Sequence, residues 1–304
     1  MTITVLVPDE HGVDRLSGVD GIRPLRYALD EPLPEGADEA NVLVPGFLSK
    51  GRELELVPKL PELEYVQLLS AGAELWIGQV PERMLLSTCR GAHNVSTAEL
   101  VVGGLIGVYR EFGQFAADQR AARWNQHRTD TLQGKRALIV GAGDIGEAIA
   151  TRLNLFDTAT TMVGRTKRDG VHGVDELPQL LGDHHIVVVV VPLTSATTKL
   201  VDAEFLARMP DDAVLVNAAR GPVVDTDALV AELDAGRLRA VLDVTDPEPL
   251  PPDHPLWRMP GLVLFPHQGG TCTGHEDRAW KIAAEEIIRF SRGERPRNLV
   301  RGEY

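Results

Sequence analysis

Between residues 134 and 271 the chain alternates short apolar runs with helical segments, and this alternation restricts the fold more than any other feature of the sequence. The runs RALIVGA, TATTMVG, HIVVVVVP, AVLVNAA, RAVLDV and GLVLFPH are typical of β-strands, and helical segments separate the first five. Strands that alternate with helices pair in parallel through right-handed crossovers. We therefore predict a doubly wound α/β sheet for this part of the chain.

The residues before this region carry a second set of apolar runs, ITVLVP, NVLVPGF and LEYVQLLS, which indicate strands of another open α/β sheet. The leucine spacing of residues 51–67 predicts a helix that Pro58 and Pro61 stop. At the other end of the chain, the pattern of residues 275–294 predicts an amphipathic helix.

A long apolar helix is predicted over residues 96–118, with Ser96 or Thr97 as its N-cap, and such a helix could connect two domains. The polar residues 119–136 follow it and predict an extended arm. Two interpretations of this arm stay open: a surface loop, or an oligomer contact anchored by Trp124.

Composition narrows the partners and the compartment. A formal net charge of −13 argues against nucleic acid or an anionic membrane as the main partner. Only two cysteines occur, Cys89 and Cys272, without CxxC spacing, so we expect a cytoplasmic protein without a disulfide framework. No apolar run approaches the roughly 18 residues of a membrane span, and the N-terminus reads as a strand rather than a signal peptide. We also expect no bound metal.

The stretch RALIVGAGDIGEAIATRL places Gly141, Gly143 and Gly146 in GxGxxG spacing between a predicted strand and a predicted helix. In this context the first glycine permits a tight turn, the second lets a pyrophosphate approach the backbone, and the third lets helix and strand pack closely. The free N–H groups of the helix N-terminus would face the phosphates. The sequence therefore predicts a dinucleotide site, the alternative being a glycine-rich turn without a ligand.

The next strand bears on which dinucleotide binds. Units that bind NAD usually place Asp or Glu at this strand end to hold the ribose 2′-OH. Here the strand ends in GRTKRDG, so that Arg165, Thr166, Lys167 and Arg168 take its place. A guanidinium can bind a 2′-phosphate with paired N–H donors, whereas a carboxylate would repel it. We predict a preference for NADP(H), with NAD(H) as the alternative cofactor; a merely solvated basic turn also stays open.

Four polar side chains follow later strands of the predicted sheet: Arg220, Asp243, Glu248 and His267. Ligands of parallel α/β sheets bind beyond the carboxyl ends of the strands, where the glycine loop also lies. Each side chain has a simpler explanation by itself, and a lone histidine after an apolar run is more often a buried structural residue. Their convergence on one edge favours an active site.

The chain resembles the D-isomer-specific 2-hydroxyacid dehydrogenase family over nearly its whole length, through STAELVVGGL, GKRALIVGAGDIG, VPLTSATTKLVD, LVNAARGPVVD, LDVTDPEPLPPDHPLW and PHQGG. In that family the Arg of the ARG motif, the Glu before PL and the His of the PH motif form the active site. These fall on Arg220, Glu248 and His267. Arg220 would pair with the substrate carboxylate and polarise the carbonyl, and His267, supported by Glu248, would exchange a proton with the carbonyl oxygen.

The same resemblance implies the remaining binding residues. Asp243 would face the nicotinamide carboxamide, and the backbone of LSAGAE would grip the substrate carboxylate. Cofactor contacts are expected at Gly141, Gly143, Asp144, Ile145, Gly146, Arg165, Thr166, Lys167, Arg168, Pro192, Thr197, Ala218, Ala219, Asp243 and Gly269, and substrate contacts at Ser70, Ala71, Gly72, Ala73 and Phe47.

The resemblance also implies the domain organisation and the reaction. Residues 1–95 with 272–304 would form a flavodoxin-like α/β substrate domain, and residues 96–271 a doubly wound, parallel-sheet Rossmann domain. We expect a homodimer that transfers hydride between NADP(H) and a small 2-keto or 2-hydroxy acid of the D-series, working as a glyoxylate or hydroxypyruvate reductase. Formate and phosphite dehydrogenases share this scaffold, so another hydride donor stays open. A nucleotide-sensing, corepressor-like binding protein of the same superfamily is the alternative.

Overall fold

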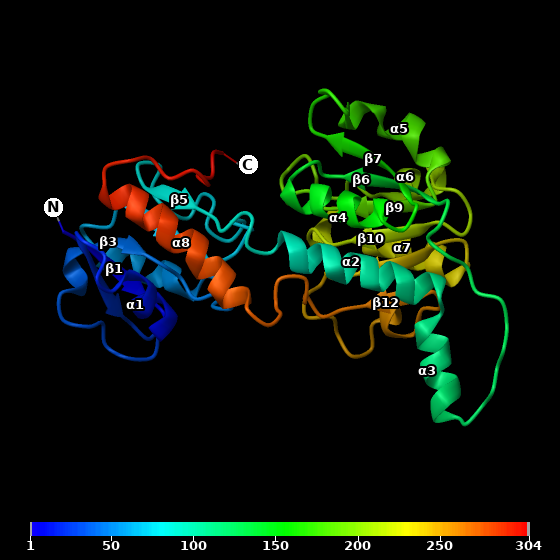
Figure 1. Cartoon of the computed structure of the whole chain (residues 1–304), viewed down its shortest axis with the longest axis horizontal. Coiled ribbons are helices and arrows are strands. Elements are labelled where there is room, and N and C mark those ends of the chain that lie inside the picture. The colour runs from blue at the N-terminus through cyan, green and yellow to red at the C-terminus, as the bar shows by residue number, and fades with distance from the viewer. Residues whose placement is uncertain (1, 303–304) are drawn as a thin grey trace. The chain divides into compact units, whose positions relative to one another are not determined.

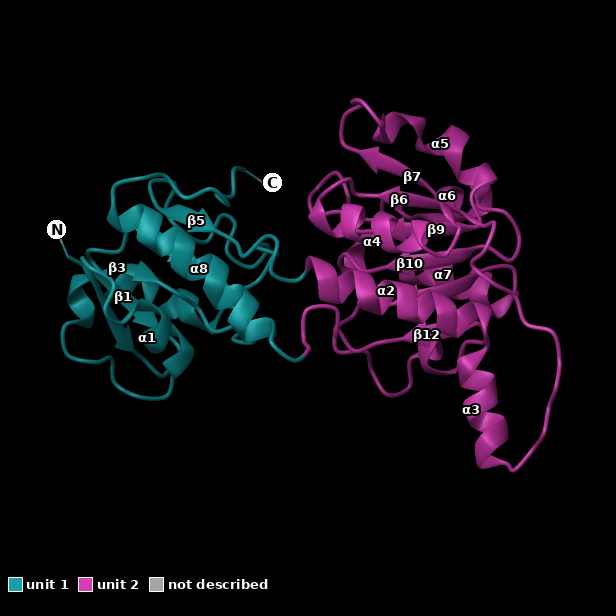
Figure 2. Ribbon diagram, viewed as in Figure 1, with its two compact units in different colours: residues 1–93, 273–304 teal, residues 94–272 magenta. Residues whose placement is uncertain are grey.

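The computed structural model describes residues 2–302. The chain divides into two compact units, the first formed by Met1–His93 with Thr273–Tyr304 and the second by Asn94–Cys272 (Figure 2). Each unit is a parallel β-sheet covered by helices, with a buried core of its own (Figure 1). The predicted α/β fold class is therefore confirmed.

The sheet of the first unit has five parallel strands in the order β2-β1-β3-β4-β5. This order is that of flavodoxin-like sheets. Three of the strands coincide with the predicted apolar runs, whereas β2 and β5 were not anticipated. The strands are β1 (Ile3–Val7), β2 (Ile22–Arg26), β3 (Ala40–Leu43), β4 (Tyr65–Gln67) and β5 (Leu85–Ser87).

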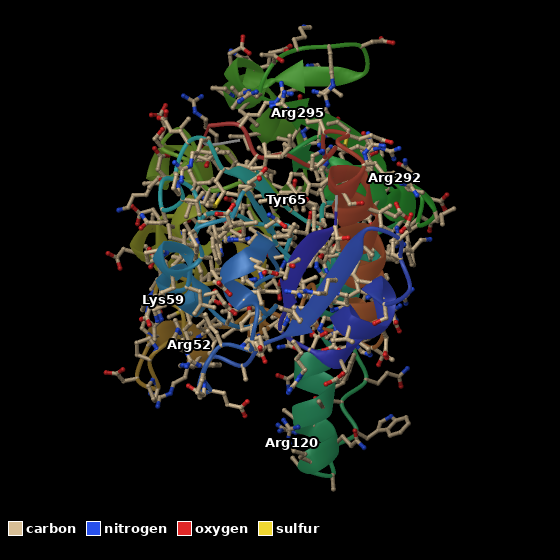
Figure 3. All side chains as sticks on the ribbon, turned by 90° about the vertical axis from the view of Figure 1, so that its left-hand side faces the viewer. Arg52, Lys59, Tyr65, Arg120, Arg292 and Arg295 are labelled. Atoms are coloured by element: carbon tan, nitrogen blue, oxygen red, sulfur yellow. The ribbon has the colours of Figure 1, made fainter. Side chains whose placement is uncertain are left out.

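One face of this sheet is covered by α1 (Glu10–Leu16) and α8 (His275–Ser291), which join the two sequence segments of the unit. Trp280 of α8 is fully buried, and a Cβ at Gly12 of α1 would lie 2.5 Å from its ring, so the two helices pack closely. Tyr65 lies in the interior of the unit (Figure 3), with its ring 5.1 Å from that of Phe290. The predicted C-terminal helix is thus present and completes the core.

The predicted helix that starts at residue 51 and is stopped by Pro58 and Pro61 is wrong in type. The segment forms two short 3₁₀ turns, Arg52–Glu55 and Val57–Lys59, with a proline in the first turn of the second. Proline lacks the N–H that an α-helix would need at this position, so the regular helix cannot continue. The leucines of the segment still face the core, and Arg52 and Lys59 lie at the surface (Figure 3).

The second unit holds seven parallel strands in the order β12-β11-β10-β9-β6-β7-β8. This is the doubly wound order: β7 and β8 are added on one side of β6, and β9 to β12 are added on its other side. The predicted runs all form strands, and β8 is an additional short one. The strands are β6 (Arg136–Val140), β7 (Ala159–Gly164), β8 (Val171–Gly173), β9 (Ile186–Val189), β10 (Val214–Asn217), β11 (Arg239–Leu242) and β12 (Leu262–Leu264).

Helices cover both faces of this sheet (Figure 1). On one face α2 (Asn94–Tyr109) and α4 (Asp144–Asn154) pack on inward residues such as Ile139, and on the other α5 (Leu177–Leu180), α6 (Ala203–Arg208) and α7 (Thr226–Asp234) belong to the cluster of Leu138. Successive strand residues point to opposite faces, which is why both are apolar here. A Cβ at Gly104 of α2 would lie 2.5 Å from Val241, so this helix lies very close to the sheet.

The predicted long helix over residues 96–118 is in fact two helices. The first, α2, begins at Asn94, so that Ser96 and Thr97 lie within its first turn rather than at its cap. The second, α3 (Phe112–Arg120), starts after Glu111, which adopts the left-handed backbone conformation with φ 54° and interrupts the helical path. Figure 1 shows α3 leaving the body of its unit, and Figure 3 shows Arg120 at the end of that helix.

Residues 121–135 form no helix or strand, as predicted for the arm. The buried carboxylate of Asp118 organises its start, because it accepts hydrogen bonds from Gln114 and Asn125, each at 3.0 Å, and pairs with Arg123 at 3.1 Å. These bonds leave the side chain of Trp124 93 % exposed. Within residues 2–302, no helix is both long and apolar enough to cross a membrane.

Candidate active site

The carboxyl ends of the strands in the second unit lie along one edge of the sheet. Val140 pairs with Val189, Val189 with Asn217 and Asn217 with Leu242, so these strands end at the same level. The next strand follows this register through Leu264. All the candidate residues of the second unit stand in the loops that leave this edge or in the first turn of α4.

The glycine loop between β6 and α4 has the three steric features expected of a phosphate-binding turn. Gly141 has φ 124°, and a Cβ there would lie 2.5 Å from the carbonyl oxygen of Val190. At Gly146 a Cβ would lie 2.0 Å from the carbonyl oxygen of Gly141. At Gly143, by contrast, no described atom lies within 4 Å of the Cβ position. The backbone is therefore open where a pyrophosphate would approach, and Asp144 and Ile145 begin the helix behind it.

The basic turn after β7 lies against the glycine loop. Arg168 donates from Nη2 to the carbonyl oxygen of Ala142 at 2.8 Å, which joins the two loops. Lys167 pairs with Glu176 at 3.0 Å. The side chains of Arg165 and Thr166 are exposed at the end of the strand. Residues 165–168 thus place cationic groups beside the loop that would hold the phosphates of a dinucleotide.

The loop after β9 is held together by Thr197. Its hydroxyl donates to the carbonyl oxygen of Pro192 at 2.6 Å and accepts from the N–H of Thr194 at 2.8 Å. The structure therefore brings the candidates Pro192 and Thr197 into contact. A loop closed by such side-chain bonds presents its backbone groups in a defined direction.

A buried asparagine that the sequence interpretation missed holds the loop after β10. Asn217 is 1 % exposed, its Oδ1 accepts from the N–H of Ala219 and its Nδ2 donates to the carbonyl oxygen of Arg220, each at 3.0 Å. It therefore fixes the backbone on which Ala218, Ala219 and Arg220 stand. A polar residue at the end of an otherwise apolar strand was the signal in the sequence.

Arg220 stands in a turn that packs against the loop carrying Glu248. Its Nη1 donates to the carbonyl oxygen of Ala219 at 2.7 Å, and the side chain is partly buried. A Cβ on the following Gly221 would lie 1.9 Å from the carbonyl oxygen of Thr245. Only glycine permits this approach, so the two loops are locked side by side.

Asp243 fixes the backbone around the candidate histidine. Its carboxylate accepts hydrogen bonds from the N–H groups of Gln268 at 2.6 Å and Gly269 at 3.0 Å, and its carbonyl oxygen accepts from the N–H of His267 at 2.7 Å. Burial raises the pKa of the Asp243 carboxyl above its ordinary value, although these N–H donors act in the opposite direction. A Cβ at Gly269 would lie 2.7 Å from the same carboxylate, and 3.2 Å from Thr97, so glycine is needed here too.

His267 and Glu248 form a hydrogen-bonded pair, with Nδ1 and Oε1 2.7 Å apart. Their side chains are 45 % and 43 % exposed, so His267 is not a buried core histidine. Its backbone has φ 56°, a conformation that is rare for a residue with a side chain and costs about 1–3 kcal/mol. An imidazole held at the surface by a carboxylate can donate or accept a proton.

The other candidates lie in the first unit. Ser70 donates to the carbonyl oxygen of Gly72 at 2.7 Å, and its own carbonyl oxygen accepts from Cys89 N–H at 2.8 Å, which holds residues 70–73 in a turn. The ring of Phe47 lies 5.2 Å from that of His93 and 5.0 Å from that of His275. The sequence interpretation did not single out these two histidines, which lie far from Phe47 along the chain.

Within the described residues, no group of three or more His, Cys, Asp or Glu side chains is arranged to hold a metal ion. The candidate residues of the second unit are those of the glycine loop and the basic turn, together with Arg220 and the His267–Glu248 pair.

Comparison with known proteins identifies the family of this chain. Residues 102–269 match the model of the family described as D-isomer specific 2-hydroxyacid dehydrogenase, NAD binding domain. A glyoxylate reductase of Thermofilum pendens is 34 % identical over 83 % of this chain and 78 % of its own length. A D-3-phosphoglycerate dehydrogenase of Methanocaldococcus jannaschii is 28 % identical over 98 % of this chain and 59 % of its own length.

A solved structure is similar over the full chain. A D-isomer specific 2-hydroxyacid dehydrogenase from Xanthobacter autotrophicus Py2, in complex with NADPH and MES, superposes with a TM-score of 0.84 and 28 % identity, covering 100 % of this chain and 99 % of its own. The family match spans more than half of the chain and contains the glycine loop, Arg220, Glu248 and His267. The chain belongs to the D-isomer specific 2-hydroxyacid dehydrogenase family.

Proposed function

We propose that this protein is an NADP(H)-dependent reductase of small 2-keto acids, of the glyoxylate or hydroxypyruvate type. The observation that carries the proposal is the His267–Glu248 pair, 2.7 Å apart, at the same sheet edge as Arg220 and the glycine loop. Support comes also from the relative named glyoxylate reductase, which is 34 % identical to this chain.

The cofactor would lie along the carboxyl edge of the second unit. Its pyrophosphate would approach the open backbone at Gly143, and its nicotinamide carboxamide would face Asp243. The nicotinamide supplies or accepts the hydride. The basic turn of residues 165–168 would hold a 2′-phosphate, as charge-assisted hydrogen bonds to guanidinium groups do. The NADPH in the Xanthobacter structure supports the same choice, and NAD(H) is the alternative cofactor.

The keto acid would be bound by its carboxylate and activated at its carbonyl oxygen. Arg220 would pair with the carboxylate and polarise that oxygen, and the backbone N–H groups of residues 70–73 would bind the carboxylate as well. His267, oriented by Glu248, would donate the proton that the developing alkoxide needs. Phe47 would contact the substituent of the substrate.

A second copy of the chain is proposed as the partner of the arm that follows α3. Phe112, Phe115 and Trp124 are 57 %, 38 % and 93 % exposed, and a hollow of about 510 Å³ lies between α3 and the arm. Large exposed apolar groups gathered on one projection are typical of an interface. We propose a homodimer, and place it in the cytoplasm because the chain has only two cysteines, Cys89 and Cys272, without CxxC spacing.

A spectrophotometric panel tests the function. NADPH and NADH are each offered with glyoxylate, hydroxypyruvate, pyruvate, phenylpyruvate and 2-ketoisocaproate. We expect the highest kcat/KM with NADPH as cofactor and either glyoxylate or hydroxypyruvate as substrate. Tight NADPH binding without turnover on any acid would instead indicate the nucleotide-sensing protein, and a clear preference for NADH would contradict the cofactor assignment.

A further inference from the structure

Glu176 is the centre of a small network beside the basic turn. Its Oε1 accepts from the N–H of Gly173 at 2.9 Å, and its Oε2 lies 3.0 Å from both His172 Nδ1 and Lys167 Nζ. The carboxylate is the less exposed partner, at 28 %, against 70 % for the lysine side chain. The carboxylate is therefore the fixed member of the pair, and the lysine the adjustable one.

The position of Glu176 is set by the sheet. The short strand β8 pairs with the end of β7, with Gly164 opposite Gly173, so the turn that carries Glu176 leaves the sheet beside the basic turn. The carboxylate caps this turn through Gly173. Mainly because of that backbone donor, followed by His172 and Lys167, the pKa of Glu176 is lowered to about 2. It therefore carries its negative charge at all pH values at which the enzyme would work.

We propose that Glu176 is a specificity-determining residue, which pairs with Lys167 and so reduces the affinity of the basic turn for the 2′-phosphate of NADP(H). The inference rests on the proposed binding of that phosphate by residues 165–168. A 2′-phosphate carries more than one negative charge near neutral pH. It must therefore compete with the Glu176 carboxylate for Lys167, and the same carboxylate repels it. The 2′-hydroxyl of NAD(H) experiences neither effect. Glu176 thus reduces the difference between the affinities of the protein for NADP(H) and for NAD(H).

The test is a binding measurement on the full-length protein. Titration calorimetry measures the affinities for 2′,5′-ADP and 5′-ADP, which differ only in the 2′-phosphate. The same comparison is then made with the whole cofactors, NADP⁺ and NAD⁺. Glu176→Gln keeps the shape and an acceptor for Gly173 while removing the charge. We expect 2′,5′-ADP and NADP⁺ to bind about three- to tenfold more tightly to this variant, with 5′-ADP and NAD⁺ unchanged within about twofold.

Asp183→Asn is the matched control for net charge. Asp183 lies in the turn before β9, at the opposite edge of the sheet, and pairs with Arg136 at 3.9 Å. The Asp183→Asn variant should bind all four nucleotides with unchanged affinity. An equal gain in this control would show a response to overall charge and would overturn the role of Glu176. A thermal melt of each variant verifies that the fold is retained.

A second cycle tests the pairing itself. Lys167→Ala should weaken 2′,5′-ADP binding only slightly in the native background, because the lysine is held by Glu176, and clearly more in the Glu176→Gln background. Equal losses would overturn the proposal. The proposed cofactor preference is judged separately: if the native protein binds 2′,5′-ADP no better than 5′-ADP, that preference fails, whereas unchanged affinities in Glu176→Gln refute the role of Glu176 alone.

Discussion

His267 and Glu248 are joined through Nδ1 and Oε1 at 2.7 Å, while the backbone N–H of the same histidine donates to the carbonyl oxygen of Asp243, also at 2.7 Å. Ring and backbone are therefore both oriented by the loop that follows β11. With Nδ1 occupied by the carboxylate, Nε2 is the ring nitrogen that we expect to exchange a proton with substrate.

Replacing His267 by Ala should lower kcat for keto acid reduction about 10²-fold or more, because the alkoxide then loses its proton donor. Initial rates of NADPH oxidation at saturating substrate measure it. Gln268→Ala, at the exposed neighbouring position, is the control and should retain turnover within about threefold. Near-native kcat in the His267 variant would contradict the assignment.

Two glycine-to-alanine substitutions in the glycine loop should affect different properties, one the stability and the other the cofactor affinity. Gly146→Ala places a Cβ 2.0 Å from the carbonyl oxygen of Gly141 and should reduce the free energy of unfolding by at least about 1 kcal/mol. Gly143→Ala meets open space, so stability should stay within about 0.5 kcal/mol while the Kd for NADPH rises about tenfold. Denaturant melts and fluorescence titrations separate the two, and an unchanged Kd in Gly143→Ala would exclude a phosphate at this position.

Arg165→Ala should raise KM for NADPH about tenfold or more and leave KM for NADH within about twofold, because only the 2′-phosphate requires the guanidinium. The ratio of the two kcat/KM values is the relevant quantity. Equal losses with both cofactors would place Arg165 near the shared part of the dinucleotide instead.

Asn217→Ala should affect both stability and substrate binding. The substitution leaves the N–H of Ala219 and the carbonyl oxygen of Arg220 without their buried partner, which costs about 1–3 kcal/mol of unfolding free energy. Because the loop also carries the guanidinium of Arg220, KM for the keto acid should rise. A destabilised variant with native KM would show that Asn217 supports only the fold.

Trp124→Ala should weaken self-association at least tenfold, because a large exposed aromatic is the type of residue that dominates interfaces. Sedimentation velocity over a concentration series measures the change. Leu155→Ala, at a position 82 % exposed after α4, is the control for loss of a surface apolar group. A native protein that stays monomeric at all concentrations would refute the proposed dimer.

Much of the fold and of the candidate site could be predicted because the signals are local. The strand–turn–helix alternation follows from the apolar pattern of one short segment at a time, and the glycine spacing specifies a backbone that other residues cannot adopt. The carboxyl-edge position of Arg220, Asp243 and His267 follows from the parallel order of the strands alone. The short strands β2, β5 and β8 gave too little pattern to be anticipated, since two of them have three residues each.

The sequence by itself determined the α/β class, the strands of both sheets with strong apolar runs, the glycine loop and the set of polar residues at one edge. Only the tertiary structure decided the break at Glu111, the clamp of Asn217 on the Arg220 turn and the pairing of Lys167 with Glu176. The physical reason is that periodicity and turn chemistry act between neighbours in the chain. Contacts between loops, in contrast, depend on strand order, register and the packing that brings distant segments to the same place.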